Sequence, residues 1–250
     1  MVMKINVILV LIVVSGLLSC EKNLKIDFDC LSPSLQDGVI AFYTFSNGSL
    51  EDFSSNNNSL MNPTAAGLTT DRNGNENCAY IFNNLLQDGE YLTMEDPEFL
   101  NGLSEFSISI WYQPLNSSRP GGMYESLLSR GEGRRCPDRD GEWSVGLYDS
   151  RRAVFGHNNS VWVSPISEVE NWYHIVVVLE SNTYKIYWNG SLEEEKVGNA
   201  NCTNFQEAQS LGNMFIGNKF TGKIDDVIIY NRVLNENEII ELSTLGACCD

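Results

Sequence analysis

Acidic side chains are the most abundant groups in this sequence that could do chemistry, since 33 Asp and Glu stand against 16 Lys and Arg. A glycoside hydrolase needs two carboxylates flanking the bond that it cleaves, and a spacing such as Glu-x-Asp-x-x-Glu along a strand provides them. The chain contains no such spacing. The nearest acidic run, Glu193 to Glu195, follows an Asn189-Gly190 hairpin turn among polar residues, which indicates a solvated face rather than a catalytic pair.

The two histidines are the next candidates for catalysis. His174 lies in an apolar stretch, and we interpret it as a core histidine whose hydrogen bonds are satisfied. His157 stands beside Asn158 near an expected strand end, where a histidine is more often a loop residue than a base. A Ser-His-Asp order, a phosphate-binding glycine loop and a Cys/His zinc spacing do not occur in the sequence. We therefore expect no catalytic activity.

Arginines are concentrated between residues 130 and 152, and their forked guanidinium groups suit sugar hydroxyls and carboxylates. Arg134 and Arg135 lie in the loop before the expected strand at 143–148. The strand that follows runs in the opposite direction, so it ends beside this loop. Either Trp143 or Trp162 could offer a ring for stacking there. The predicted ligand-binding residues are Arg134, Arg135, Asp138, Asp140, Trp143, His157 and Asn158.

The arginine-rich loop has a second interpretation. Its arginines could pair with the acids of the same loop as a solvated salt-bridge network that binds nothing. Both interpretations stay open at this point. The acids concerned are Glu132, Asp138, Asp140 and Glu142.

Length and charge limit the partners. The chain has 250 residues, 42% of them hydrophobic, which is enough for one sizeable core. Its formal charge of −17 repels phosphate backbones and anionic headgroups. We therefore expect no nucleic-acid partner.

The elements that would position these side chains are strands. Short β-branched and aromatic runs recur between turn-forming clusters. The run at 106–112 alternates cleanly, whereas that at 172–179 is apolar on both faces, like a central strand covered on both sides. These patterns predict an all-β, two-sheet antiparallel sandwich with one short C-terminal helix, capped by Asn235. The expected strands are 39–45, 106–112, 143–148, 172–179, 184–188, 214–217 and 223–230.

The N-terminus is typical of an export signal. Lys4 precedes the apolar run Val7 to Val14, which is too short to cross a bilayer stably. The following Leu17-Leu18-Ser19-Cys20 resembles a bacterial lipobox, in which the cysteine receives a lipid and becomes the new N-terminus. Ordinary cleavage near Ser19, with a free secreted product, is the alternative.

The lipobox predicts the organisation of the chain. We expect a signal peptide at 1–19, a lipidated tether at 20–37 and a folded domain at 38–250. The protein would then lie in the bacterial cell envelope, outside the cytoplasm. Its membrane attachment would come only through the lipid on Cys20.

The order of these segments resembles the laminin-G-like, concanavalin A-type jelly-roll domain of bacterial surface proteins. The resemblance covers about Gly38 to Leu242, and Gly222 to Leu234 is its most specific motif. One departure is Gly131 to Gly141, which is rich in arginine where the family usually has a plain turn. The supporting segments are 39–45 with 52–56, 106–111, 171–177, 184–190 and 216–217.

The resemblance implies a non-catalytic module for adhesion or recognition that binds glycans or a surface protein. The same sandwich also carries glycoside hydrolases and polysaccharide lyases, so a fold alone does not exclude an enzyme. A divergent polysaccharide-degrading enzyme is therefore the alternative function.

The resemblance also implies a structural calcium ion. Ca²⁺ takes about six to eight oxygen ligands, and the loop after the first expected strand would bring Asp52 and Asn57 to Asp225 on the last strand. Strand alternation turns Asp225 and Asp226 to opposite faces, so only Asp225 would face the loop. In the metal-free alternative, Asp52 caps its own loop and Asp225 accepts backbone N–H groups.

The cysteines after Cys20 are suited to disulfides in an exported protein. A jelly roll brings the chain ends together, so Cys30 should pair with Cys248 or Cys249. A weaker prediction joins Cys136 to Cys202, which leaves Cys78 for the other terminal cysteine.

Overall fold

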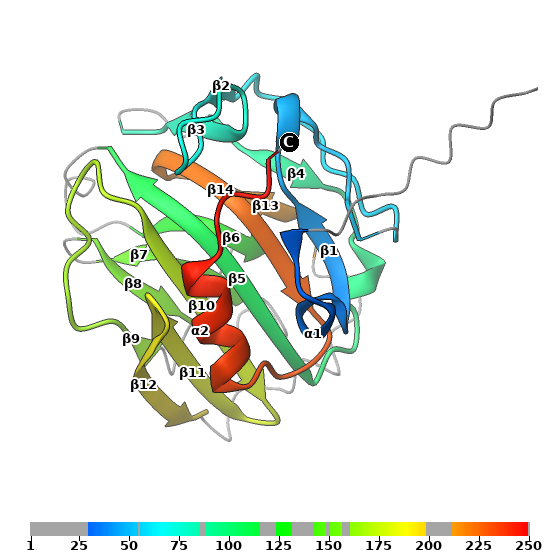
Figure 1. Cartoon of the computed structure of the whole chain (residues 1–250), viewed down its shortest axis with the longest axis vertical. Helices are drawn as coiled ribbons and strands as arrows, with labels where there is room; N and C mark the ends of the chain where they lie inside the picture. Colours follow the sequence, from blue (N-terminus) through cyan, green and yellow to red (C-terminus); the bar gives the residue numbers. More distant parts are fainter. Residues whose placement is uncertain are drawn as a thin grey trace, which may run out of the picture.

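Two antiparallel sheets lie face to face and enclose most of the apolar side chains (Figure 1). Regular structure in the described residues is mostly strand, with two α-helices and two short 3-10 helices. The predicted all-β sandwich is confirmed. The computed structural model describes residues 30–54, 56–85, 89–115, 124–131, 143–148, 151–156, 161–198 and 212–249.

The first sheet has eight strands, in the order β12-β11-β10-β5-β14-β3-β2 with β1 paired to β14. Strand β5 is central because β10 pairs with one of its edges and β14 with the other. The strands are β1 (Val39–Tyr43), β2 (Gly67–Thr69), β3 (Ala79–Asn83), β5 (Glu105–Pro114), β10 (Tyr173–Glu180), β11 (Thr183–Trp188), β12 (Ser191–Val197) and β14 (Thr221–Tyr230).

The second sheet has six strands, in the order β4-β13-β6-β7-β8-β9. Strands β6, β7, β8 and β9 follow one another along the chain and pair as an antiparallel meander. The strands are β4 (Leu92–Met94), β6 (Glu125–Arg130), β7 (Trp143–Tyr148), β8 (Arg152–Phe155), β9 (Val161–Trp162) and β13 (Met214–Ile216). The 3-10 helices are η2 (Ser46–Gly48) and η3 (Glu98–Leu100).

The main core lies between the two sheets. Every second residue of β5 from Phe106 to Tyr112 belongs to it, as the alternation in the sequence predicts. The ring of Phe106 lies 5.4 Å from that of Trp143 and 6.1 Å from that of Phe155, centroid to centroid. Burying a large apolar side chain contributes about 1.5–3 kcal/mol, so these rings tie β5 firmly to β7 and β8.

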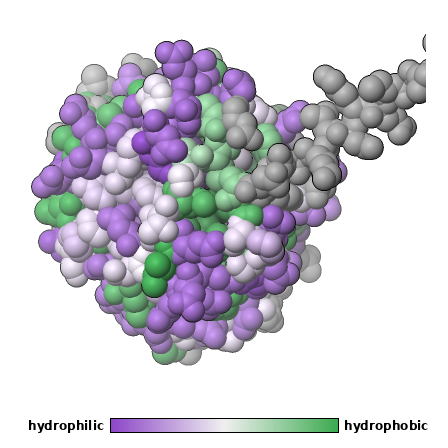
Figure 2. All heavy atoms as spheres, in the orientation of Figure 1, coloured by the Kyte–Doolittle hydropathy of each residue, from purple (hydrophilic) through white to green (hydrophobic). Residues whose placement is uncertain are grey.

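A second apolar layer covers the outer face of the first sheet. Val176 and Val178 of β10 point into this layer, whereas Val177 points into the main core. The α-helices α1 (Pro33–Gln36) and α2 (Glu236–Thr244) contribute to it, and α2 lies across β10 in Figure 1. This explains why β10 is apolar on both faces. The outside of the layer is largely hydrophilic, with smaller apolar patches (Figure 2).

Helix α2 begins with the cap that the sequence predicts. The Asn235 side chain accepts hydrogen bonds from the backbone N–H groups of Asn237 and Glu238, and the Glu238 carboxylate accepts one from the Asn235 N–H. This reciprocal pair satisfies N–H groups that a helix end otherwise leaves open. No described helix is long and apolar enough to cross a membrane.

The folded part begins before the expected boundary at Gly38. Leu31 and Leu35 are buried in the second apolar layer, and Cys30 forms a disulfide with Cys248. Residues 30–37 are therefore part of the packed domain, which corrects the expected extent of the tether. The sequence does not indicate this, because only two apolar residues make the contacts: Leu35 in the four-residue helix α1, and Leu31 before it.

Candidate functional site

The second apolar layer lies on the first sheet. It does not cover the outer face of the second sheet. Alternation along β7 turns Val145 and Leu147 into the core and leaves Ser144, Gly146 and Tyr148 on the outside. The strand pairing extends this alternation of inward and outward side chains to the neighbouring strands of the sheet. The described outward side chains are Thr93, Ser126, Ser129, Ser144, Tyr148, Arg152, Val154, Trp162 and Phe215.

Tyr124 closes the middle of this face. Its hydroxyl lies 2.6 Å from Oγ of Ser144, and Ser126 Oγ is 3.3 Å from the same oxygen. A Cβ atom on Gly146 would lie 2.1 Å from the backbone oxygen of Glu125 and 2.6 Å from the Tyr124 hydroxyl, so glycine is needed at this position. Burial raises the pKa of Tyr124 above its ordinary value, which keeps the phenol neutral.

The end of the face near Tyr148 is open. Tyr148 is 40% exposed, and its ring meets the half-buried Trp162 ring in a T-shaped contact with 5.5 Å between centroids. We call Tyr148 and Trp162 the aromatic platform. Arg152 is exposed and lies opposite Tyr148 in the β7–β8 register, so the two side chains leave the sheet on the same face.

Glutamates hold the edge strand that carries Trp162. The backbone N–H of Trp162 donates to the Glu194 carboxylate at 2.6 Å, and that of Ser164 donates to Glu193 at 3.3 Å. These N–H groups point away from β8 at the edge of the second sheet, where a free donor would invite pairing with another chain. The acidic run therefore caps an edge strand, and this position explains it without a catalytic role.

Trp143 is not available to a ligand. It is 3% exposed, and its indole packs against Phe106 in the main core. The prediction that Trp143 offers a stacking surface is therefore wrong, because the alternation of β7 turns it inward. Trp162, the other tryptophan considered for stacking, lies on the outer face.

The remaining predicted ligand residues lie outside the described part of the chain, as do Cys20, Cys136 and Cys202. The aromatic platform lies at the opposite end of β7 from Trp143, so it is a different location from the one that the sequence predicts. The residues concerned are Arg134, Arg135, Asp138, Asp140, His157 and Asn158.

Asp52 organises the loop that the sequence assigned to calcium. Its carboxylate accepts hydrogen bonds from the backbone N–H groups of Phe42, Ser54 and Asn58 at 2.8–3.0 Å, and from the Ser54 hydroxyl at 2.7 Å. Both carboxylate oxygens are engaged, and the loop is attached to β1 through Phe42. Asn57 is exposed in this loop.

Asp225 is engaged elsewhere, with a buried arginine. Nη1 of Arg72 lies 2.6 Å from Oδ2 of Asp225 and 2.7 Å from Oδ2 of Asp226. The guanidinium carbon also lies 4.5 Å from the centroid of the Trp111 ring. Burial, together with the charge of Asp226, raises the pKa of Asp225 well above its usual value, and Arg72 acts against this rise.

Both aspartates reach the same guanidinium, which corrects the expectation that they face opposite sides. The β5–β14 register shifts between Asp225 and Ile228, and Asp226 has a φ of 35°. A bulge of this kind breaks the two-residue alternation. The sequence gives no local sign of it.

These contacts do not fit a calcium ion shared by Asp52 and Asp225. The Asp52 oxygens accept four hydrogen bonds inside the loop, while a guanidinium occupies the Asp225 carboxylate. A cation would have to displace these donors. The hydrogen bonds instead favour the metal-free alternative, in which Asp52 caps its loop and Asp225 accepts a backbone N–H, here that of Asp226.

His174 is a core histidine, as the sequence predicts, but its hydrogen bonds are only half satisfied, because Nδ1 is buried without a partner among the described residues. It is fully buried, its Nε2 lies 2.8 Å from the Ser109 hydroxyl, and its ring lies 4.9 Å from that of Trp111. Burial, with the positive charge of Arg72, lowers the pKa of His174 to about 3. The ring is therefore neutral at physiological pH, and its burial keeps it from any substrate.

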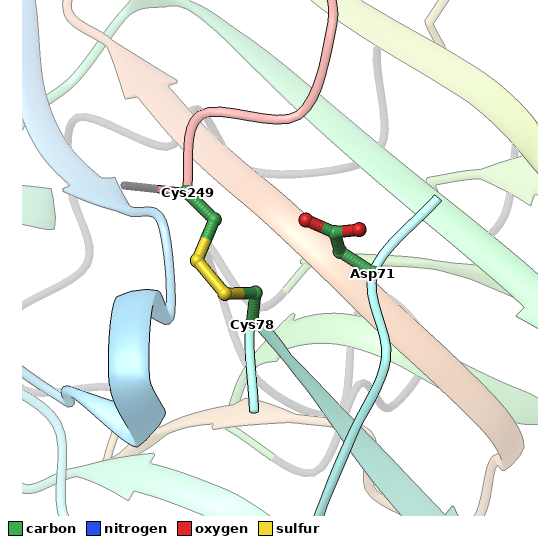
Figure 3. Close-up of side chains that lie close together, drawn as sticks. All are labelled: Asp71, Cys78 and Cys249. Carbon is green, nitrogen blue, oxygen red and sulfur yellow. A yellow bond between two sulfur atoms is a disulfide. The ribbon is translucent and has the colours of Figure 1, made fainter. Parts of the chain in front are cut away.

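Two disulfides hold the C-terminal segment over this region. Cys248 is bonded to Cys30 and Cys249 to Cys78, with Cα–Cα distances of 5.6 and 5.8 Å. Figure 3 shows Asp71 beside the second bond. Its carboxylate accepts hydrogen bonds within its own turn, and the two sulfurs are bonded to each other, so this cluster offers no thiolate to a metal.

Sequence reasoning missed Arg72, which lies outside every expected strand. It also missed Tyr148 as a surface ring, although the alternation of β7 carries that information. Once Trp143 is assigned to the core, the same period places Tyr148 on the outside.

Comparisons with known proteins agree with this geometry. The family model Laminin_G_3, described as the concanavalin A-like lectin/glucanases superfamily, matches residues 86–240. No curated protein matches the chain in sequence.

Solved structures of low sequence identity share the fold. The binding domain of Paraclostridial Mosquitocidal Protein 1 has a TM-score of 0.65 and 19% identity over 84% of this chain and 52% of that one. Domain 4 of AbnA, a GH43 extracellular arabinanase from Geobacillus stearothermophilus solved with arabinotriose, has a TM-score of 0.59 and 15% identity over 82% of this chain and 98% of that one.

The binding domain of Botulinum neurotoxin DC, solved with rat synaptotagmin II, has a TM-score of 0.61 and 17% identity over 84% of this chain and 52% of that one. This chain therefore spans about half the length of the two toxin domains. The family match covers more than half of the sequence, and its range includes strands of both sheets, from β4 to β14. The chain belongs to the concanavalin A-like lectin/glucanases superfamily.

Proposed function

We propose that this protein is a non-catalytic recognition module that binds a glycan through the aromatic platform. The observation that carries the proposal is the exposed Tyr148 ring, set against Trp162 on an outward sheet face. The C–H face of a sugar ring packs on such a ring and buries apolar area, while its hydroxyls remain free for hydrogen bonds.

The chemistry of this face supports binding rather than hydrolysis. A glycoside hydrolase needs two carboxyl groups about 5–10 Å apart across the scissile bond. The outward side chains of the second sheet within the described residues include no Asp or Glu. Glu125, at the start of β6, is buried and accepts a hydrogen bond from the backbone N–H of Thr221.

The structural neighbours support a binding role and leave two ligand classes. One is a domain of an arabinanase in complex with arabinotriose, and another is a toxin binding domain in complex with synaptotagmin II. A protein partner is therefore the second candidate. We favour a glycan because the described platform is small, with two rings and one adjacent arginine.

We also propose that the protein is a lipoprotein of the bacterial cell envelope, anchored through Cys20. The proposal rests on the lipobox-like Leu17-Leu18-Ser19-Cys20. The described chain starts at Cys30, whose disulfide partner Cys248 lies on the outer face of the first sheet. The platform lies on the second sheet, which packs against the opposite face of the first sheet.

A glycan array followed by affinity gels tests the function on the chain from Glu21 onward, which contains every described residue. Tyr148→Ala should weaken binding of an array-selected polysaccharide by about tenfold, or about 1.4 kcal/mol. Ile240→Ala, which removes an exposed apolar side chain from α2, is the matched control and should bind normally. Release of reducing ends or unsaturated products would establish an enzyme instead.

A further inference from the structure

Arg152 stands beside the aromatic platform and gives that site a charge preference. We propose that Arg152 makes the platform selective for sugars that carry a carboxylate, such as a uronic acid or a sialic acid. This inference rests on the proposed glycan-binding function and adds the chemical class of the ligand.

The β7–β8 register places Arg152 at the platform. Arg152 pairs with Tyr148, and side chains of paired residues leave an antiparallel sheet on the same face. Trp162 is on that face too, one strand further along, because it pairs with Val154. A sugar stacked on Tyr148 would therefore lie within reach of a long, exposed guanidinium.

Arg151 and Arg152 have different roles, although they are adjacent. Arg151 has a φ of 64°, and its Nε donates to the Ser167 carbonyl at 2.6 Å, so it holds the segment that follows β9. Arg152 is exposed. Salt bridges within the described residues involve Arg72, Lys185 and Arg232, so Arg152 has no carboxylate partner among them.

The chemistry of guanidinium selects carboxylate among sugar substituents. Its planar fork donates two parallel hydrogen bonds to the two oxygens of a carboxylate, which a neutral hydroxyl cannot accept in the same way. The chain as a whole carries −17, so a densely charged polyanion is repelled. A glycan with a single terminal acidic sugar suits a single arginine in an acidic protein.

The experiment compares matched oligosaccharides by calorimetry with the chain from Glu21 onward. The probes are trisaccharides that end in glucuronic, galacturonic or sialic acid, each paired with its carboxyl-reduced form. Wild type should bind at least one acidic form about five- to tenfold more tightly than the reduced form, as an exposed bidentate pair allows. The preference should fall as NaCl rises.

Three variants assign the preference. Arg152→Gln should bind both members of a pair equally, at the affinity of wild type for the reduced form, and Arg152→Lys should keep part of the preference. Lys196→Gln removes one exposed positive charge from β12 and should keep all of it. The exposed position of Arg152 predicts an unchanged melting temperature for its variants.

The outcomes separate the two proposals. Equal binding of acidic and reduced forms by wild type, with both weakened by Tyr148→Ala, would overturn the role of Arg152 and leave the glycan-binding function standing. A carboxylate preference that survives in Arg152→Gln would also overturn it. Failure of wild type to bind any probe or array glycan would overturn both proposals.

Discussion

Nη1 of Arg72 donates to Oδ2 of Asp225 at 2.6 Å, and both side chains are buried beneath the C-terminal segment. The same guanidinium donates from Nη2 to the Gly246 carbonyl at 2.7 Å, so it joins β14 to the last residues of the chain. Asp226 completes the link by accepting the backbone N–H of Cys248 at 3.0 Å. A charge network therefore fixes the chain end on the first sheet.

Arg72→Met should destabilise the fold by about 3–5 kcal/mol, because it leaves two buried carboxylates without their cation. Urea unfolding measures the loss, and the exposed Lys196→Gln should stay within about 0.5 kcal/mol of wild type. Adding Asp225→Asn and Asp226→Asn to Arg72→Met should recover part of the stability. A loss below about 1 kcal/mol in Arg72→Met would show that water already solvates these groups.

Calcium should have no effect on stability if Asp52 and Asp225 are engaged as the structure describes. The melting temperature should be the same in excess calcium and in excess chelator. Asp52→Asn should lower it under both conditions, because the buried carboxylate accepts four hydrogen bonds. A calcium-dependent gain of about 2.7 kcal/mol at a hundredfold excess over Kd would instead restore the calcium prediction.

Acid should destabilise the protein through His174. The pKa of His174 is about 3 in the fold, against about 6.5 in the unfolded chain, so the unfolded state binds the extra proton first. The stabilisation that comes from the neutral, buried ring is fully present above about pH 6.5. It is lost as the pH falls from about 6.5 to 3, by about 1.4 kcal/mol per pH unit.

Denaturant titrations between pH 4 and 8 check this. His174→Gln, whose amide can still bond to Ser109, should show a shallower fall in unfolding free energy than wild type. His157→Gln is the control, since His157 is the only other histidine of the chain. This variant should keep the wild-type slope. Equal slopes in wild type and His174→Gln would contradict the prediction.

The two terminal bonds should each contribute to stability. Cys30–Cys248 spans 218 residues and Cys78–Cys249 spans 171, and the chain-entropy model gives about 5 kcal/mol for loops of this size, with smaller measured values common. Replacing both cysteines of either bond by serine should lower the unfolding free energy by about 2–5 kcal/mol.

Single variants distinguish the two adjacent cysteines. Cys30→Ser should leave Cys248 as the free thiol, and Cys78→Ser should leave Cys249. Alkylation and fragmentation of the C-terminal peptide locate the label. The label on Cys249 in Cys30→Ser would show the crossed pairing.

Long elements were predictable from the sequence because each carries its own period. β5 alternates, β10 is apolar on both sides, and α2 has a cap that only side chains adjacent in sequence provide. Strands β2, β4 and β9, with two or three residues each, have no period to detect. They become strands because a neighbouring strand supplies backbone partners, which is information from distant sequence.

The site was less predictable for the same reason. Trp143 and Tyr148 stand at the two ends of one strand, and only the direction of the core decides which is buried. Asp225 and Asp226 depart from simple alternation because of a bulge that partner strands impose. Arg72 acts on residues more than 150 positions away, and nothing near it in the sequence announces this.

The bond between Cys30 and Cys248 also determines how the protein responds to proteolysis. A protease that cuts once at any peptide bond between these residues opens the loop but leaves its two pieces covalently joined. If the chain is anchored through Cys20 as proposed, a nicked molecule would keep both fragments attached to the anchor. On a denaturing gel it would run as one species without reductant and as two with it.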